Sequence, residues 1–127
     1  MLSVCMIVKD EAANLPHILA NVRGVADEII VVDTGSTDET KEIAKAAGAK
    51  VFDFPWCDDF SAARNYSLDQ ATKSMILWLD ADDRISQHAR RALASWKSQY
   101  HRKMYFCHVM NTGGSEFLQL RIVPNDK

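Results

Sequence analysis

The chain has 127 residues, enough for one hydrophobic core but short for two, so we expect a single domain over residues 1–127. Apolar residues make up 47% of the sequence and charged residues 25%, a composition that excludes disordered and fibrous proteins. The formal net charge of -2 lacks the basic surplus with which proteins bind nucleic acid polymers, so we do not expect such polymers as partners.

No apolar stretch reaches the ~20 residues that span a bilayer, so no transmembrane segment is expected. Residues 1–11 lack the basic start and the small-residue cleavage site of a secretory signal. The chain has three cysteines, Cys5, Cys57 and Cys107, and no two of them have C-x-x-C spacing. This odd number and wide spacing favour neither a disulfide framework nor a cysteine zinc site. These features predict a cytoplasmic location, with peripheral attachment at the inner face of the membrane as the alternative.

In the first half of the chain, apolar runs alternate with helical patterns. Residues 2–8 and 28–32 are β-branched apolar runs that predict buried strands, and residues 15–22 between them have the apolar spacing of a helix. Ser36 and Glu39 have capping-box spacing and predict the start of the next helix, which ends before Gly48. A third strand is expected over residues 49–52.

The second half continues the same alternation. Residues 53–60 have the composition of a loop, Ser61 is expected to cap a helix that runs to Ala71, and residues 74–79 predict a fourth strand. Ser86 is expected to cap a further helix. Residues 104–110 and 117–123 then predict two strands joined by a loop that contains two glycines.

This order of elements predicts an α/β fold with three layers, in which helices cover both faces of a mostly parallel sheet. In such a sheet the ligand crevice lies outside the carboxyl ends of the strands. Several predicted strands are followed by acidic residues, which we therefore expect to gather at one edge. They are Asp10, Glu11, Asp33, Asp80, Asp82 and Asp83.

Carboxylates that gather at one edge repel one another unless cations or hydrogen-bond donors compensate them. A divalent metal with a phosphorylated ligand is the interpretation we favour. Asp80 and Asp82 offer hard oxygen ligands directly after a buried strand, which suits Mg²⁺ or Mn²⁺ completed by diphosphate oxygens and water. A solvated acidic turn is the alternative for these two residues.

Other residues near this edge have side chains that suit a nucleotide. Asp33 can accept a hydrogen bond from a base imide or a ribose hydroxyl, or it can simply begin a turn. Arg64 can offset the acidic edge and bind phosphate or a base carbonyl, or it can be a surface arginine on an amphipathic helix. Trp56 and Phe60 can form a wall for a sugar or base, although aromatic residues near a sheet edge more often belong to the core.

Four segments together resemble a known family in their order and spacing. The segments are SVCMIVKDEAANL, EIIVVDTGSTDET, DFSAARNYSLDQA and MILWLDADD, and QLRIVPND is weakly similar to a later segment. They resemble the nucleotide-sugar half of family 2 glycosyltransferases, which have a Rossmann-like fold of the GT-A type. The resemblance implies a metal-dependent enzyme that transfers a sugar, with inversion, from a nucleotide-diphosphate donor to an acceptor hydroxyl.

The resemblance also implies roles for individual residues. Asp33 would contact the base, which is uracil by preference, in a pocket that Val8, Asp10 and Glu11 also line. Arg64 would touch the nucleotide. Asp80 would approach the ribose or the metal, and Asp82 would be the metal ligand next to the diphosphate, with Mg²⁺ or Mn²⁺ as the cofactor.

The acceptor half of the family follows these motifs, and the resemblance implies that the catalytic base lies there. We therefore expect the chain to be a portion of a longer enzyme, truncated before the acceptor-binding half, with an acceptor that is a glycan, a lipid or a protein. The alternative is a module that binds a nucleotide without transferring a sugar. Haloacid-dehalogenase phosphatases, sugar-nucleotide pyrophosphorylases and phospho-receiver domains each match fewer of the motifs.

Overall fold

The structure is a computed structural model that describes residues 1–96, 105–110 and 116–125. The elements follow one another as β1 (Leu2–Val8), α1 (Leu15–Val22), β2 (Glu28–Asp33), α2 (Thr40–Ala46), β3 (Lys50–Asp53), α3 (Phe60–Asp69), β4 (Met75–Asp80), α4 (Gln87–Trp96), β5 (Tyr105–Met110) and β6 (Glu116–Pro124). This order matches the alternation that the sequence predicts.

The strands form one sheet in the order β3, β2, β1, β4, β6, β5. The first four strands in this order are parallel, whereas β6 runs antiparallel to β4, and β5 runs antiparallel to β6. The predicted mostly parallel sheet is therefore confirmed. Because β1 lies between β2 and β4 in the parallel part, it is covered on both edges and both faces, which explains its nearly continuous apolar sequence.

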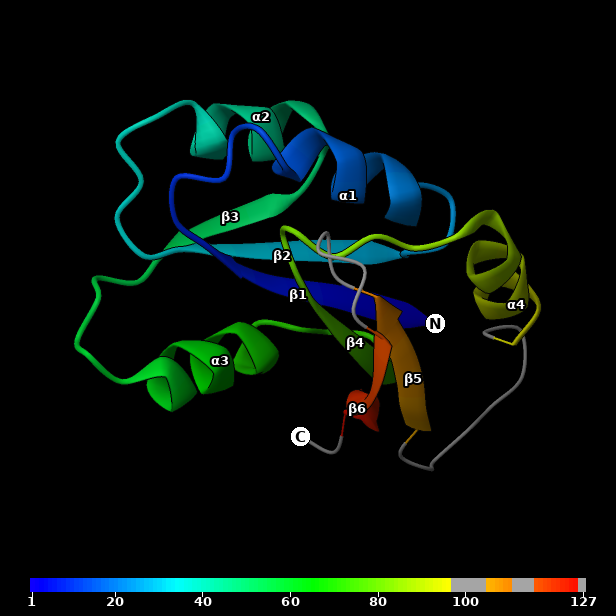
Figure 1. Ribbon diagram of the computed structural model, residues 1–127. Helices are drawn as coiled ribbons and strands as arrows, with labels where there is room; N and C mark the ends of the chain where they lie inside the picture. Colours follow the sequence, from blue (N-terminus) through cyan, green and yellow to red (C-terminus); the bar gives the residue numbers. More distant parts are fainter. Residues whose placement is uncertain (97–104, 111–115, 126–127) are drawn as a thin grey trace.

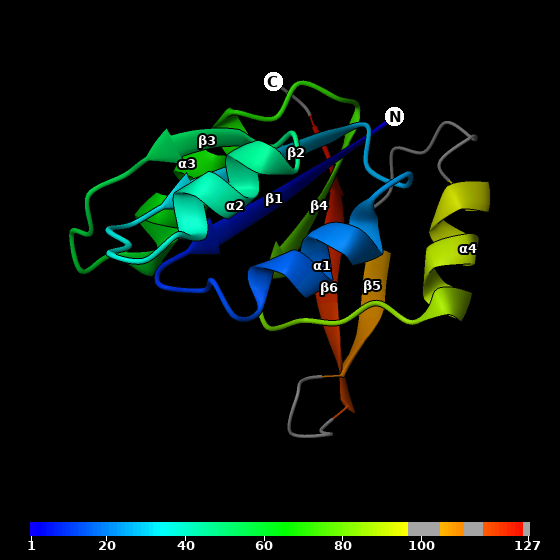
Figure 2. The ribbon, with the colours of Figure 1, turned by 90° about the horizontal axis from the view of Figure 1, so that it is seen from above.

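Helices cover both faces of the sheet, as expected. Figure 1 shows α1 and α2 on one face and α3 on the other. The larger apolar core lies beneath α1 and α2 and includes Ile18 and Ala44, and Leu93 of α4 packs against it. A smaller core lies beneath α3 and includes Ile30, and Tyr66 packs against this cluster. In the view from above in Figure 2, α2, α1 and α4 follow one another across the picture, with α4 at the far end from α2.

Two predicted helix caps are wrong. Helix α2 begins at Thr40 and not after Ser36, because Ser36 lies in a loop where its Oγ accepts a hydrogen bond from the backbone of Asp10 (2.8 Å). Helix α3 begins at Phe60, one residue before the predicted cap Ser61, because the carboxylate of Asp59 accepts a hydrogen bond from the Ala62 N–H (3.1 Å). Helix α3 thus has a side-chain cap at Asp59, whereas the residue before α2, Glu39, makes no side-chain capping hydrogen bond.

A buried glutamate ties the sheet together at the end opposite the strand-end carboxylates. Glu28 accepts hydrogen bonds from Ser3 Oγ (2.9 Å), from Thr72 N (2.9 Å) and Oγ1 (2.6 Å), and from Lys50 Nζ (2.9 Å). Burial alone would raise the pKa of Glu28, but these donors outweigh it and lower the pKa from 4.5 to about 2. The ionised carboxylate thus joins β1, β2, β3 and the segment before β4.

In the part of the chain that the structure describes, none of the helices combines the length with the apolar character needed to cross a membrane.

Candidate functional site

The predicted site residues meet at one edge of the sheet because β1, β2 and β4 are parallel and end in register. Val8 at the end of β1 pairs with Asp33 at the end of β2, and Ile7 pairs with Asp80 at the end of β4. Asp33 and Asp80 therefore lie on opposite sides of β1, at the ends of the two strands that flank it. The expectation that the acidic strand ends share one edge is correct.

Asp33 is almost completely buried, with 3% of its surface exposed. Its Oδ1 atom accepts hydrogen bonds from the backbone N–H groups of Gly35 (2.9 Å) and Ser36 (2.8 Å), which forms the turn after β2. Its Oδ2 atom is also buried but has no hydrogen-bond partner among the residues that the structure describes. A buried acceptor without a donor is costly, so this oxygen is suited to a donor that a ligand supplies.

The loops that follow β1 and β2 are fastened to each other by side chains. Asp10 has a left-handed backbone (φ 52°), and its Oδ1 accepts a hydrogen bond from the Thr37 N–H (2.7 Å). The Glu11 N–H donates to Thr40 Oγ1 (2.9 Å), and the Ala12 N–H donates to Asp38 Oδ2 (3.3 Å). The carboxylate of Asp10 therefore holds the loop that follows Asp33, a function that the sequence does not reveal.

Thr40 also acts on Asp38 within this pair of loops. The Thr40 hydroxyl and backbone N–H both donate to Asp38 Oδ1, and the hydroxyl bond is the main reason that the pKa of Asp38 is lowered. Asp38 therefore stays ionised, and its second oxygen is bound to the loop after β1. Sequence reasoning missed this role, although the spacing of Asp38 and Thr40 matches a local side-chain turn.

The acidic cluster at the end of β4 consists of Asp80, Asp82 and Asp83, which can each direct one oxygen to within 4.8 Å of the others. Their surroundings differ. Asp82 is exposed, whereas Asp83 is buried (5% exposed) and accepts a hydrogen bond from the Asp80 N–H through Oδ2 (2.8 Å). Hard carboxylate oxygens at this spacing could hold Mg²⁺ or Mn²⁺, and Asp82 and Asp80 are the more accessible carboxylates of the cluster.

Arg64 reaches the same cluster from α3, which lies on the face of the sheet that α1 does not cover. Its guanidinium lies over the ring of Trp78, with Cζ 3.8 Å from the ring centroid, and its Nη2 atom is 4.0 Å from Asp80 Oδ1. The side chain of Arg64 is 23% exposed. The alternative of an ordinary surface arginine is therefore wrong, since the guanidinium is stacked and faces a carboxylate.

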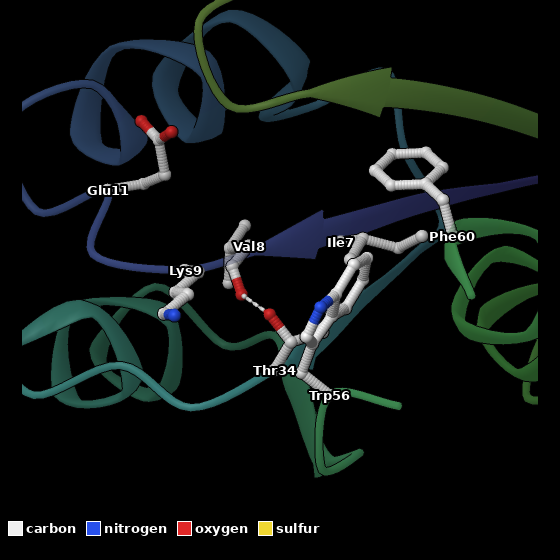
Figure 3. A pocket seen from close by; sticks show the side chains of 7 residues that line it. All are labelled: Ile7, Val8, Lys9, Glu11, Thr34, Trp56 and Phe60. Carbon is white, nitrogen blue, oxygen red and sulfur yellow. Dashed lines mark hydrogen bonds between the residues drawn. The ribbon is translucent and has the colours of Figure 1, made fainter. Parts of the chain in front are cut away.

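A pocket of about 260 Å³ opens between the ends of β1 and β2 and the loop before α3. It is lined by Ile7, Val8, Lys9, Glu11, Thr34, Trp56 and Phe60, which Figure 3 draws as sticks. Val8 is held in place because its carbonyl oxygen accepts hydrogen bonds from Thr34 N (3.0 Å) and Oγ1 (3.3 Å). Val8 and Glu11 thus line this pocket, whereas Asp10 and Asp33 are not among its lining residues.

The expectation that Trp56 and Phe60 belong to the core is wrong. Trp56 is 45% exposed and Phe60 is 53% exposed. Phe52, Phe54 and Tyr66, which are partly buried, pack against the core on this face of the sheet instead, and Tyr66 contacts both phenylalanine rings.

Comparison with known proteins gives a consistent result. The family model described as "Glycosyl transferase family 2" matches residues 3–122. A TPR repeat-containing protein of Synechococcus elongatus is 52% identical over 97 residues, which cover 76% of this chain and 24% of that protein. An uncharacterised glycosyltransferase of Rickettsia typhi is 36% identical over 86 residues, which cover 68% of this chain and 29% of that protein. The chain thus spans about a quarter of the length of these relatives.

Solved structures with the same fold include glucosyl-3-phosphoglycerate synthase of Mycobacterium tuberculosis, in complex with Mn²⁺, UDP and glucosyl-3-phosphoglycerate. It superposes with a TM-score of 0.58 and 26% sequence identity, over 65% of this chain and 34% of the synthase. The family match, the parallel sheet and the acidic strand ends agree. The chain belongs to glycosyl transferase family 2.

Proposed function

We propose that this chain binds a nucleotide-diphosphate sugar at the carboxyl edge of its sheet, as the donor-binding domain of a metal-dependent, inverting glycosyltransferase. The observation that carries the proposal is the pairing of two features at one edge. A buried, unpartnered acceptor oxygen of Asp33 lies on one side of β1, and the acidic cluster Asp80, Asp82 and Asp83 lies on the other. A nucleoside diphosphate needs a hydrogen-bond acceptor for its base and a cation site for its phosphates.

At the base end, Asp33 Oδ2 is proposed to accept a hydrogen bond from an imide N–H. Uracil has such a donor, and UDP is the nucleotide in the structures of the M. tuberculosis synthase. Val8 and Glu11 are proposed to line the same subsite, because both face the pocket beside Thr34. Asp10 is proposed to support the subsite indirectly, since its carboxylate is bonded to Thr37.

At the diphosphate end, Asp82 and Asp80 are proposed to hold Mg²⁺ or Mn²⁺. The M. tuberculosis synthase has been crystallised with UDP and either of these ions. When bound, such an ion supplies positive charge that stabilises the leaving diphosphate. Asp83 is proposed to keep the turn in shape through its hydrogen bond to the Asp80 N–H, and Arg64 to orient Asp80 and meet the nucleotide.

The proposed reaction is the transfer of a sugar to an acceptor hydroxyl with inversion at the anomeric carbon. The acceptor is proposed to be a glycan, a lipid or a protein, and the base that deprotonates it is proposed to come from outside this chain. Residues 1–127 are proposed to form one domain, and a cytoplasmic location, with the inner face of the membrane as the alternative, stays a prediction. The alternative is a module that binds a nucleotide without transferring a sugar. Measured sugar transfer would exclude this alternative, and nucleotide binding without transfer would support it.

A thermal-shift titration tests the donor site. The chain is heated with UDP, GDP, CDP or dTDP, each with Mn²⁺, with Mg²⁺ or with EDTA, because a ligand that binds only the folded state raises the melting temperature. We expect one nucleotide, UDP by preference, to raise the melting temperature only when a metal is present. The absence of a shift with all four nucleotides would contradict the proposal.

A further inference from the structure

We propose that Trp56 and Phe60 form an aromatic wall against which the nucleobase of the donor stacks, so that the loop between β3 and α3 determines how strongly the base contributes to binding. This inference rests on the proposed function, because it assigns a part of the same site. It concerns the base and leaves the choice of sugar and acceptor open.

The first argument is the exposure of the two rings. Exposing large aromatic side chains is unfavourable, and contiguous exposed apolar surface beside a cavity marks a binding site. Among the described residues, Trp56, Phe60 and the terminal Met1 are the exposed large hydrophobic side chains. The Trp56 and Phe60 rings touch each other edge to face, with centroids 6.3 Å apart and an interplanar angle of 71°. Both rings line the pocket.

The second argument is that the Trp56 ring is held in place before any ligand arrives. Its Nε1–H group donates a hydrogen bond to Asp58 Oδ1 (2.9 Å), two residues further along the loop. Asp58 has a left-handed backbone (φ 59°), an unfavourable conformation that aspartate tolerates better than most residues. The loop therefore fixes the indole by a local bond, which reduces the entropy that is lost when a flat ligand stacks on it.

The third argument is the position of the wall relative to Asp33 and the acidic cluster. Figure 3 shows the Trp56 and Phe60 rings on the side of the pocket away from Glu11. The pocket is bordered by Thr34, the residue that follows Asp33, so the wall lies beside the end of β2 that Asp33 forms. The acidic cluster lies at β4, two strand spacings or about 10 Å from β2. The base is thus placed at the wall and the diphosphate at the cluster.

The size of the pocket favours a base over a complete sugar nucleotide. Pockets that enclose an entire ligand measure roughly 300–1,000 Å³. The pocket here, at about 260 Å³, is smaller and has aromatic residues on one side. Stacking on an aromatic ring adds binding affinity for any flat heterocycle, because it does not depend on which hydrogen-bond donors and acceptors the heterocycle carries. The wall therefore supplies affinity for the base, while Asp33 supplies the choice among bases.

Calorimetric titration of four proteins tests the proposal: the wild type, Trp56→Ala, Trp56→Phe and Cys57→Ser. Each is titrated with UDP and with inorganic pyrophosphate, both in the presence of Mg²⁺. Cys57 is the matched control, because it is exposed on the same loop and does not line the pocket. We expect Trp56→Ala to weaken UDP binding about tenfold or more and to change pyrophosphate binding less than about twofold. Trp56→Phe should retain most of the affinity for UDP, and Cys57→Ser all of it.

The other outcomes are distinguishable. If the wild type binds UDP and Trp56→Ala binds it equally well, the aromatic wall is refuted and the proposed function stands. If Trp56→Ala loses affinity for UDP and pyrophosphate alike, the residue acts on the whole site and the assignment to the base is refuted. If the wild type binds pyrophosphate with Mg²⁺ but no nucleotide, both the wall and the proposed function fail.

Discussion

The guanidinium of Arg64 stacks on the indole of Trp78, with Cζ 3.8 Å from the ring centroid. The two residues come from α3 and β4, and the stack holds the arginine with its Nη2 atom 4.0 Å from Asp80 Oδ1. Phe60 lies on another side of the same guanidinium, 5.1 Å from Cζ to the ring centroid. Arg64 therefore connects the acidic cluster at β4 with the aromatic residues of the pocket.

This arrangement predicts that lysine cannot replace Arg64. Arg64→Lys keeps the positive charge but loses the flat surface that stacks on Trp78, so we expect a loss of about 1 kcal/mol of stability and weaker binding of UDP in the presence of Mn²⁺. Thermal denaturation and calorimetry measure the two effects. Arg91→Lys on the exposed surface of α4 is the control and should behave as the wild type. Unchanged UDP affinity in Arg64→Lys would show that the stack does not serve the site.

Asp82 and Asp83 are predicted to differ, although both belong to the acidic cluster. Asp82→Ala should leave the free energy of unfolding within about 0.5 kcal/mol of the wild type, because the side chain is exposed, but should abolish the metal-dependent binding of nucleotide. Asp83→Ala should cost about 1–3 kcal/mol, because the partly buried Asp80 N–H loses its acceptor. Urea denaturation and thermal-shift titration measure these effects. Metal-dependent binding that survives in Asp82→Ala would remove this residue from the metal site.

The unpartnered oxygen of Asp33 is predicted to lower the free energy of unfolding and to strengthen the binding of UDP. In Asp33→Asn the amide oxygen can still accept from Gly35 and Ser36, while the amide nitrogen replaces the unpartnered Oδ2. We therefore expect the free variant to be at least as stable as the wild type, and its affinity for UDP to fall about tenfold or more, because a donor now faces the donor of the base. Asp33→Ala, which also loses the turn, should be less stable. A less stable Asp33→Asn variant with full affinity would contradict this explanation.

Glu28 is predicted to make stability depend on pH in the acid range. Its pKa is about 2 in the folded protein against 4.5 in the reference state, so the ionised form stabilises the fold above pH 4.5. This contribution, about 3 kcal/mol, should be lost as the pH falls from about 5 towards 2. The difference in unfolding free energy between the wild type and Glu28→Gln, measured by urea denaturation, should therefore be largest near pH 7 and shrink towards pH 2. Glu42→Gln, exposed on α2, should show no such difference.

The sequence by itself determined the order of elements and the edge at which the carboxylates meet. The runs 2–8 and 28–32 are largely apolar on both faces, as strands buried in a parallel sheet are, and parallel strands bring their carboxyl ends to one edge. The family motifs could be recognised for the same reason, because Asp33 and Asp80 end strands that local pattern already identifies.

Only the tertiary structure decided what each side chain at that edge does. Asp10 bonds to Thr37, 27 residues away, and Arg64 stacks on Trp78, so neither contact follows from local spacing. The same holds for the exposure of Trp56, since it is Phe54 and Tyr66 that pack against the core beneath α3. Periodicity reports which residues prefer to be buried, whereas contacts between distant segments depend on how those segments pack, and packing decides which oxygen is satisfied and which is left for a ligand.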